Sequence, residues 1–257
     1  MHKYLTMTLI LLFLLASTTF AAAPLTADQV AQLTYDRYIG EDMQMRGTME
    51  LISKNGHIRS REFSSFRKDS NAKRKQLIRF TAPADIDGTS FLTLETDNNS
   101  NTEQHLYLPA LKRTRRIVAS QKGRSFVNSD FTYEDMQRHS VEAWSYQLEG
   151  EETIFGHACY ILISSPKPET DTQYSKLVSW IEKNSFIPLK TIFFENKEQQ
   201  AKSYSVNAFE IIDNIATETD VVMEDLLSGH KTRLKTLGIK YNSGLKDSLF
   251  TTRALER

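Results

Sequence analysis

Residues 43–51 read MQMRGTMEL, and this stretch decides the fold class. Its large apolar side chains occupy alternate positions, with polar or charged side chains between them: Met43, Met45, Met49 and Leu51. Because successive side chains of a β-strand point to opposite faces, this alternation is typical of a strand that is buried on one face only. The stretch is therefore predicted to be a half-buried strand.

Comparable runs recur along the rest of the chain, separated by turn-forming segments such as 54–56, 97–100 and 228–229. They cover residues 75–81, 90–96, 104–109, 144–149, 157–164, 176–183, 189–195, 202–211, 217–224 and 231–241. Many strands with short turns predict a mainly β (α+β) protein built on one long antiparallel meander. A sheet of that size must close, fold over or be covered, so we expect it to curl.

Helices are predicted at three places only. LTADQVAQLTYDRYI, residues 25–39, begins with Thr26 as a candidate cap and carries Asp28 in its first turn. A second short helix is expected to begin at Ser129 or Asp130, and a third within LKDSLFTTRALER, residues 245–257. These few helices are expected to cover only part of the sheet.

The beginning of the chain has the pattern of a secretory signal. His2 and Lys3 precede an apolar run over residues 5–16, and small residues follow at 19–23. The run is too short for a comfortable membrane span, and no cysteine stands at the boundary to accept a lipid. We therefore expect a signal peptide at 1–23, a single domain at 24–257, and a soluble periplasmic protein that is not lipid-anchored.

Composition argues against several functional classes. The 257 residues include 32 Lys and Arg against 32 Asp and Glu, so broad electrostatic binding of nucleic acid is not expected. The six histidines form no HExxH pair, the glycines form no G-x-G loop, and Cys159 is the lone cysteine. We therefore do not expect the protein to be an enzyme, and we expect neither a metal site, a cofactor nor a nucleic-acid partner.

A curled sheet with an apolar concave face would leave a long hydrophobic cavity under its helices. Such a cavity suits an acyl chain, and unbranched methionines adapt to ligands of varied shape. The alternative is that the same residues fill an ordinary core under the first helix. The candidate ligand-binding residues, chosen from alternating strand faces, are Met43, Met45, Met49, Ile78, Phe80, Leu92, Leu94, Leu106 and Leu108.

A basic run follows one of the predicted strands. YLPALKRTRR, residues 107–116, contains Lys112, Arg113, Arg115 and Arg116, and the acidic, aromatic SFVNSDFTYEDM follows at 125–136. Pairing of Arg115 or Arg116 with an acid of the second stretch would hold the loop and short helix over one end of the sheet as a lid latch; the acids are Asp130, Glu134 and Asp135. The alternative is an exposed basic turn that adds little to stability, or a docking patch for a partner.

These two stretches, with IEKNSFIPLK at 181–190, resemble the periplasmic outer-membrane lipoprotein-sorting (LolA-like) family. The likeness is to its branch associated with inner-membrane transporters of the RND/MMPL type. At Val127 and Asn128 the chain departs from the small residues expected in that branch. The resemblance implies an unclosed half-barrel whose hydrophobic concave face is covered by a few helices. It also implies lipid or lipoprotein cargo, an RND/MMPL-type partner and transient membrane contact.

Residues and resemblance together predict a periplasmic carrier that binds lipid or acylated lipoprotein and moves it between the inner and outer membranes. The alternative from a different class is a periplasmic sensor or adaptor that binds a protein partner through the same fold. In that case the basic residues of 112–124 would form the docking patch, and binding would weaken steeply with salt.

Overall fold

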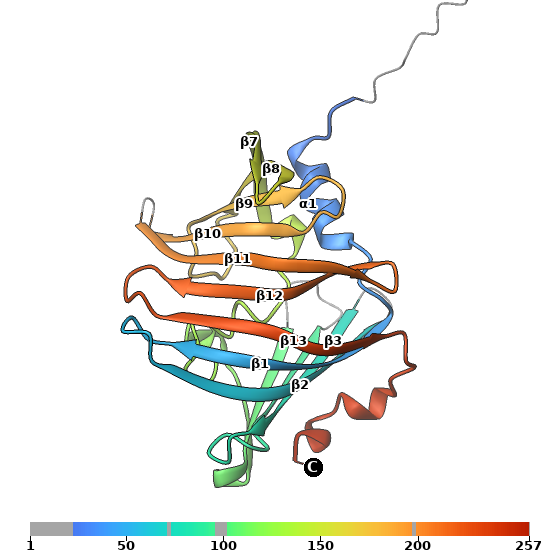
Figure 1. Ribbon diagram of the computed structural model, residues 1–257, viewed down its shortest axis with the longest axis vertical. Coiled ribbons are helices and arrows are strands. Elements are labelled where there is room, and N and C mark those ends of the chain that lie inside the picture. The colour runs from blue at the N-terminus through green and yellow to red at the C-terminus, as the bar shows by residue number, and fades with distance from the viewer. Residues whose placement is uncertain (1–22, 71–72, 96–101, 197–198, 257) are drawn as a thin grey trace, which may run out of the picture.

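The protein is described by a computed structural model over residues 23–70, 73–95, 102–196 and 199–256. Within these residues, thirteen strands form one antiparallel sheet in the spatial order β6-β5-β4-β3-β2-β1-β13-β12-β11-β10-β9-β8-β7 (Figure 1). The strands are β1 (Asp42–Ile52), β2 (Ile58–Ser70), β3 (Lys73–Ala82), β4 (Ser90–Glu95), β5 (Thr102–Leu108), β6 (Arg113–Arg116), β7 (Trp144–Ile154), β8 (His157–Pro166), β9 (Lys176–Glu182), β10 (Pro188–Asn196), β11 (Gln199–Ile212), β12 (Ile215–Asp225) and β13 (Lys231–Tyr241).

The sheet is curved and open. Its two edge strands, β6 and β7, each pair on one side only, so it is not closed into a barrel. The predicted fold class is confirmed: a mainly β protein with one large antiparallel sheet in an unclosed half-barrel. No helix among the described residues is long and apolar enough to cross a membrane. The predicted signal peptide lies outside the described residues, apart from Ala23.

Strand β2 is missing from the sequence-based prediction. Its inward face carries Arg61, Phe63, Ser65 and Arg67, which pair with inward residues of β1 and β3. Two arginines and a serine interrupt the apolar alternation, so the usual strand signal is weak although Phe63 and Ser65 are buried. One of these inward polar residues, Arg67, lines a cavity at one end of the concave face.

The first helix is confirmed as α1 (Ala27–Asp36), which lies beside β7 and β8 at the upper end of the molecule in Figure 1. Thr26 caps it reciprocally: the Gln29 amide donates to Thr26 Oγ1 at 3.2 Å, and the Thr26 amide donates to Gln29 Oε1 at 2.8 Å. Val30 and Ala31 pack on Leu162 and Ile181. The helix therefore covers one end of the concave face.

Residues 117–140, which follow β6, form a strap across the concave face. The predicted second helix at Ser129 or Asp130 is wrong, because the strap folds back on itself in turns instead. The Phe126 amide donates to the Phe131 carbonyl at 2.7 Å, and the Tyr133 amide donates to the Arg124 carbonyl at 3.1 Å. Val127 and Asn128 have φ of 46° and 61° at the reversal, which is where small residues were expected.

The strap fills one half of the concave face. Phe126 lies 4.9 Å from Phe91 and 6.1 Å from Phe80, ring centroid to ring centroid. We call this the filled half; it comprises the buried residues Met49, Leu51, Phe63, Ile78, Phe80, Phe91 and Leu106 of the sheet with Ile117, Phe126, Phe131 and Tyr133 of the strap. It is a packed core with little space for a ligand.

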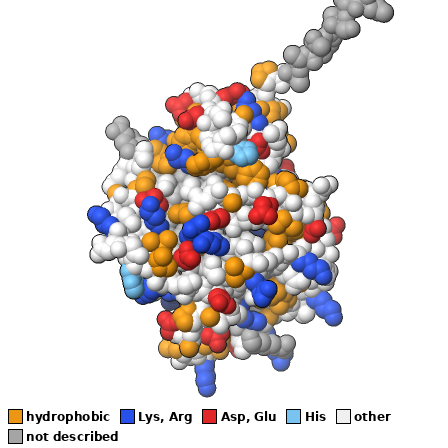
Figure 2. All heavy atoms as spheres, in the orientation of Figure 1, with side chains coloured by type: hydrophobic (Ala, Val, Ile, Leu, Met, Phe, Trp, Pro, Cys, Tyr) orange, Lys and Arg blue, Asp and Glu red, His pale blue; other side chains and the backbone are white. Residues whose placement is uncertain are grey.

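The convex face is covered behind the filled half. In place of the predicted third helix, the C-terminal segment has two short 3-10 helices, η4 (Asp247–Leu249) and η5 (Thr252–Glu256). Phe250 and Leu255 pack on Leu77 and Leu92. Over the strands that face the viewer in Figure 1, Figure 2 shows positive, negative and hydrophobic side chains intermixed.

Candidate functional site: a cavity beneath the helix

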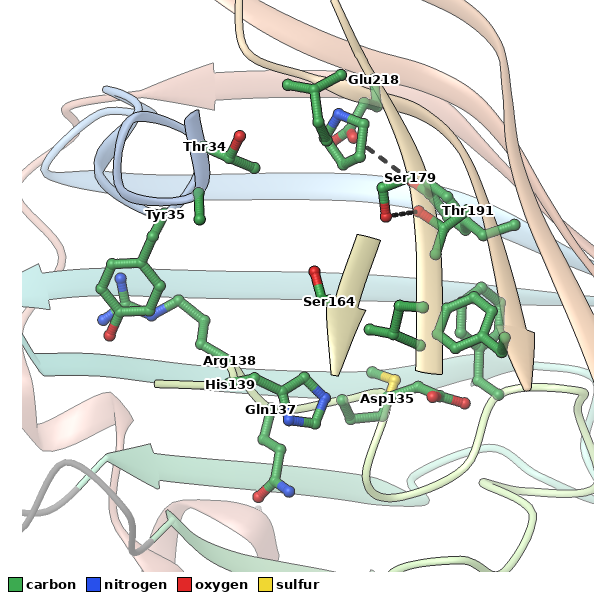
Figure 3. Close-up of a pocket in the computed structure, with 18 of the residues that line it drawn as sticks. Thr34, Tyr35, Asp135, Gln137, Arg138, His139, Ser164, Ser179, Thr191 and Glu218 are labelled. Atoms are coloured by element: carbon green, nitrogen blue, oxygen red, sulfur yellow. Dashed lines mark hydrogen bonds between the residues drawn. The ribbon is translucent and has the colours of Figure 1, made fainter. Parts of the chain in front are cut away.

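The other half of the concave face contains a cavity of about 620 Å³ (Figure 3). It lies between α1, the last residues of the strap and the inward side chains of β8 to β13, and residues of β3 and β4 also line it. We call this region the open half. A volume of several hundred Å³ is ordinary for small-molecule sites. The apolar lining residues are Ala31, Phe131, Met136, Val141, Leu162, Leu177, Ile181, Phe193, Val221, Met223 and Leu234.

Two small polar groups in the floor of the cavity are bonded to each other. Ser179 and Thr191, on neighbouring strands, share a hydrogen bond of 2.9 Å between their hydroxyl oxygens (Figure 3). A hydroxyl bonded to a neighbour costs less to cover with an apolar ligand than a free one. The floor can therefore accept a hydrocarbon without leaving those two hydroxyls unpaired.

Charged residues gather at one end of the cavity. Arg138 of the strap donates to the carboxylate of Glu95 through Nε at 2.8 Å and Nη2 at 2.6 Å, and its guanidinium lies 4.4 Å from the centre of the Tyr35 ring. Burial works against the charge, but the Glu95 carboxylate outweighs it and raises the pKa of Arg138. This pair joins the strap to β4 beside α1.

The strap is fixed to the open half by a buried ion pair. Asp135 lies 3.2 Å from Lys202 Nζ of β11, and it accepts a hydrogen bond of 2.7 Å from the Tyr174 hydroxyl. Burial is the main cause that raises the pKa of Tyr174, and the nearby Asp135 carboxylate adds to it. Tyr174 is thus a neutral donor in the physiological range.

Two further acids of the strap are bound elsewhere on the concave face. Asp130 accepts from Thr232 Oγ1 at 2.6 Å and lies 2.7 Å from His230 Nδ1. Glu134 accepts from the Thr172 hydroxyl and from the Gln173 amide. The acidic stretch therefore ties the strap to β11, β13 and the loop before β9.

His139 also lines the cavity, with its ring centroid 5.5 Å from that of Trp144. Burial lowers the pKa of its imidazole, although Glu134 and Asp135 act in the opposite direction. A neutral imidazole suits an apolar cavity. No group of three or more metal-ligating side chains is found in the part of the chain that the structure describes.

The nine candidate ligand-binding residues are divided among three environments. Met49, Ile78, Phe80 and Leu106 are buried in the filled half, and Leu108 packs against it. Met43 and Met45 line a second, smaller cavity of about 290 Å³ that adjoins the first. The remaining two, Leu92 and Leu94, pack toward the C-terminal segment on the convex side.

The prediction for β4 needs a correction of one residue. Leu77 pairs with Leu92 and Ile78 pairs with Phe91, so Leu92 and Leu94 cannot share a face with Ile78. Phe91 and Thr93 are the inward residues of this strand. β4 reads SFLTLE, with large apolar residues on both faces, so the sequence gives no indication of which face is concave.

The basic residues of the predicted latch lie away from the acids of the strap. Lys112, Arg113, Arg115 and Arg116 are exposed in the turn before β6 and on this edge strand. Arg116 pairs with Glu103 of β5 at 3.1 Å. The acids Asp130, Glu134 and Asp135 point to the partners described above, so the strap is held without these cations.

The cavity residues that the sequence did not reveal come mostly from β8 to β12 and the strap. Leu162, Leu177 and Phe193 lie in strands that were predicted, but their faces could not be assigned without the pairing register. Arg138 and His139 lie in a segment that was predicted to be a helix. Pairing with distant residues, such as that of Arg138 with Glu95, shows that this segment borders the cavity.

Comparisons with known proteins agree with this architecture. A family model described as "Uncharacterized protein" matches residues 72–257. A DUF1329 family protein from Desulfovibrio piger is 30% identical with a TM-score of 0.84, and the match covers 89% of this chain and 97% of that one. No curated protein is similar enough to count as a match.

Two further solved structures are similar. A Vibrio parahaemolyticus protein described as an outer membrane lipoprotein-sorting protein domain is 26% identical, with a TM-score of 0.83 and coverage of 90% and 98%. A LolA superfamily protein from Nitrosomonas europaea is 19% identical, with a TM-score of 0.69 and coverage of 90% and 100%; this likeness concerns the fold alone. The resemblance found in the sequence is thus confirmed at the level of family and fold.

Proposed function

The chain belongs to the DUF1329 family, with a LolA-like fold, and we propose that it is a periplasmic carrier that holds a lipid or an acylated lipoprotein in the open half. The observation that carries this proposal is the cavity of about 620 Å³ with its largely apolar lining, set beside the packed aromatic core of the filled half. The Vibrio protein described as a lipoprotein-sorting domain supports the same class of cargo.

The driving force for capture is the removal of hydrocarbon from water. Each methylene that enters an apolar site contributes about 0.8 kcal/mol, so a single acyl chain can offset the entropy lost on binding. This role needs no catalytic group and no cofactor. It further requires export, for which residues 1–23 would serve as the signal peptide and residues 24–257 as the carrier domain.

Delivery between the inner and outer membranes requires that the strap or α1 move away from the sheet. The open half is the place for such motion, because there the strap is held by polar pairs such as Asp135–Lys202 and not by packed aromatic rings. A transient contact with a membrane or with an RND/MMPL-type transporter would provide the apolar surroundings that let cargo leave.

A transfer assay tests the proposal. Donor vesicles carrying a fluorescent acyl lipid and unlabelled acceptor vesicles are mixed with the purified protein. We expect transfer that rises with protein concentration and that changes little between low and high salt, because the cargo is held by apolar contacts. Transfer no faster than the spontaneous rate at any protein concentration would contradict the carrier proposal.

The sensor or adaptor remains the second candidate because of the exposed basic segment. Leu111 is 68% exposed beside Lys112 and Arg113, and Val118 is also exposed beyond Arg116. Exposed apolar residues among cations are typical of a surface that binds an acidic protein partner. A variant in which Lys112, Arg113 and Arg115 are replaced by glutamine separates the two functions. A carrier keeps its lipid transfer between vesicles, whereas an adaptor shows no transfer in either form and loses its salt-sensitive partner in a pull-down.

A further inference from the structure

The second cavity, of about 290 Å³, has a different chemistry from the first. Three arginine side chains, Arg37, Arg67 and Arg74, line it together with a single carboxylate, that of Glu218. Lys235 also borders it, but this residue alternates with the inward Leu234 on β13 and its ammonium pairs with Glu50 at 3.6 Å. The lining is therefore rich in positive charge.

Two of these arginines already have carboxylate partners. Arg37 pairs with Glu218 at 2.9 Å, and Arg74 forms two hydrogen bonds with Asp69, from Nε at 3.0 Å and from Nη2 at 3.1 Å. Such pairs are close to neutral. They leave one arginine whose charge is incompletely balanced.

That arginine is Arg67, on the inward face of β2. It is only 8% exposed, and its Nη2 donates to the carbonyl oxygens of Ile39 and Gly40. Its Nε has no hydrogen-bond partner in the part of the chain that the structure describes. The nearest carboxylate oxygen, on Asp69, lies 3.9 Å away, which is too far for a hydrogen bond.

A buried guanidinium without a full set of acceptors is costly, and burial lowers the pKa of Arg67 to about 10. An anion placed against Nε would satisfy the open donor and balance the charge. Planar guanidinium groups bind carboxylate and phosphate oxygens especially well.

The two cavities share a border. Arg74, Gln76, Tyr204, Glu218, Val221 and Leu234 line both of them. We infer that Arg67, with Arg37 and Arg74 beside it, binds the anionic head of an amphiphile whose hydrocarbon chain lies in the larger cavity. This inference rests on the proposed function and narrows its cargo to amphiphiles with a phosphate or carboxylate head, in preference to neutral acyl anchors.

A matched set of probes tests the inference on the full chain. Decyl phosphate and 1-decanol carry the same hydrocarbon, and inorganic phosphate carries the head alone. By isothermal titration below the micellar concentration, we expect decyl phosphate to bind at least about 10-fold tighter than 1-decanol, because the charged head gains an arginine partner. Inorganic phosphate is expected to bind far more weakly than decyl phosphate.

Variants locate the head group. In Arg67→Gln the preference for decyl phosphate should shrink to within about twofold, since the head-group contact is lost while the hydrocarbon contacts of the larger cavity remain. Arg61→Gln is the matched control, because Arg61 is a partly buried arginine on the inward face of the same strand, is bonded to the Val127 carbonyl and lies outside the second cavity. If Arg67→Gln does not fold, Arg37→Gln serves as the second variant and should also reduce the preference.

The outcomes separate this inference from the carrier proposal. Equal binding of decyl phosphate and 1-decanol would overturn the anionic-head inference and leave the carrier intact. Inorganic phosphate bound as tightly as decyl phosphate would also overturn it, since the chain would then contribute nothing. Failure of both amphiphiles to bind would contradict the carrier proposal itself.

Discussion

The two halves of the concave face are built by one continuous sheet, yet one is solid and the other hollow. In the filled half, Phe126 and Tyr133 of the strap insert among Phe63, Phe80 and Phe91 and leave a packed aromatic core. In the open half, α1 covers a floor that includes small hydroxyl residues such as Ser179 and Thr191. One sheet thus combines a packed aromatic core with a cavity.

The difference also appears in how the strap is held. Aromatic packing fixes it over the filled half, whereas charged and polar pairs fix it over the open half, through Asp135 with Lys202 and Arg138 with Glu95. Polar pairs can be exchanged for water at modest net cost, while a packed core cannot open without a large loss. The open half is therefore the natural place for a ligand to enter.

The largest expected effect is the loss of an aromatic ring from the filled half. Phe126→Ala should lower the free energy of unfolding by about 3–5 kcal/mol, because it leaves a void among close-packed rings. Phe193→Ala is the matched variant in the open half and should cost clearly less, since that ring already borders a cavity. Urea unfolding followed by circular dichroism compares them, and equal losses would remove the distinction between the halves.

The next effect concerns the buried ion pair that holds the strap. Lys202→Met leaves the Asp135 carboxylate buried without its cation and should lower the free energy of unfolding by about 3 kcal/mol. Adding Asp135→Asn should recover part of that loss. Lys183→Met is the control, since its partner Glu151 is largely exposed and the pair should contribute less than about 1 kcal/mol. A double variant no more stable than Lys202→Met would count against the pairing.

A smaller change should affect binding and leave stability almost unaltered. Ser164 lines the cavity on β8, so Ser164→Leu places a larger apolar side chain in the space proposed for cargo (Figure 3). We expect affinity for decyl phosphate to fall about 10-fold, with the free energy of unfolding changed by less than about 1 kcal/mol, because the added methyl groups enter open space. Ser60→Leu, at an exposed position of β2, is the control. Unchanged affinity in Ser164→Leu would place the cargo elsewhere.

The smallest effect concerns the segment behind the filled half and depends on pH. Asp42 accepts hydrogen bonds from the amides of Ser243, Gly244 and Leu245 at 2.7–2.9 Å. Burial opposes the charge, but these bonds prevail and lower the pKa of Asp42. The stabilisation is present above the unfolded-state pKa of about 4 and is lost as pH falls through the folded-state value.

The check is unfolding of the wild type and Asp42→Asn between pH 2.5 and 7. Near neutral pH the variant should be less stable by about 1 kcal/mol, and the two proteins should converge as pH falls from about 4 through the lowered folded-state pKa of Asp42. A constant difference over the whole range would mean that the charge of Asp42 is not involved. The open half should be unaffected, which binding of decyl phosphate at pH 7 would verify.

Much of the fold could be predicted from the sequence because apolar and polar side chains alternate regularly along half-buried strands. Met43, Met45 and Met49 show this clearly, and the cap at Thr26 locates the helix. The alternation does not indicate which face of the sheet is concave, because that depends on pairing between distant strands. For this reason Leu92 and Leu94 were assigned to the concave face, although they lie on the convex one. β2 was missed because Arg61, Ser65 and Arg67 interrupt its inward face.

The candidate site was less predictable than the fold. The strap has the composition of a short helix, with Asp130 near a start, but its backbone groups bond to distant parts of the same segment and its acids to β11 and β13. The residues that contact the strap therefore could not be predicted from the residues next to it in the sequence. Likewise, the importance of Arg67 depends on its burial and on an Nε that has no acceptor among the described residues, and no sequence pattern indicates either feature.

The most direct test of the central claim is native mass spectrometry, combined with lipid extraction, of the processed protein purified from its own cells without detergent. If the open half holds cargo, the purified protein should carry one lipid or acylated protein per chain. The extracted amphiphile should bear a phosphate or carboxylate head. A protein of bare polypeptide mass that also fails to take up added lipid would contradict the claim.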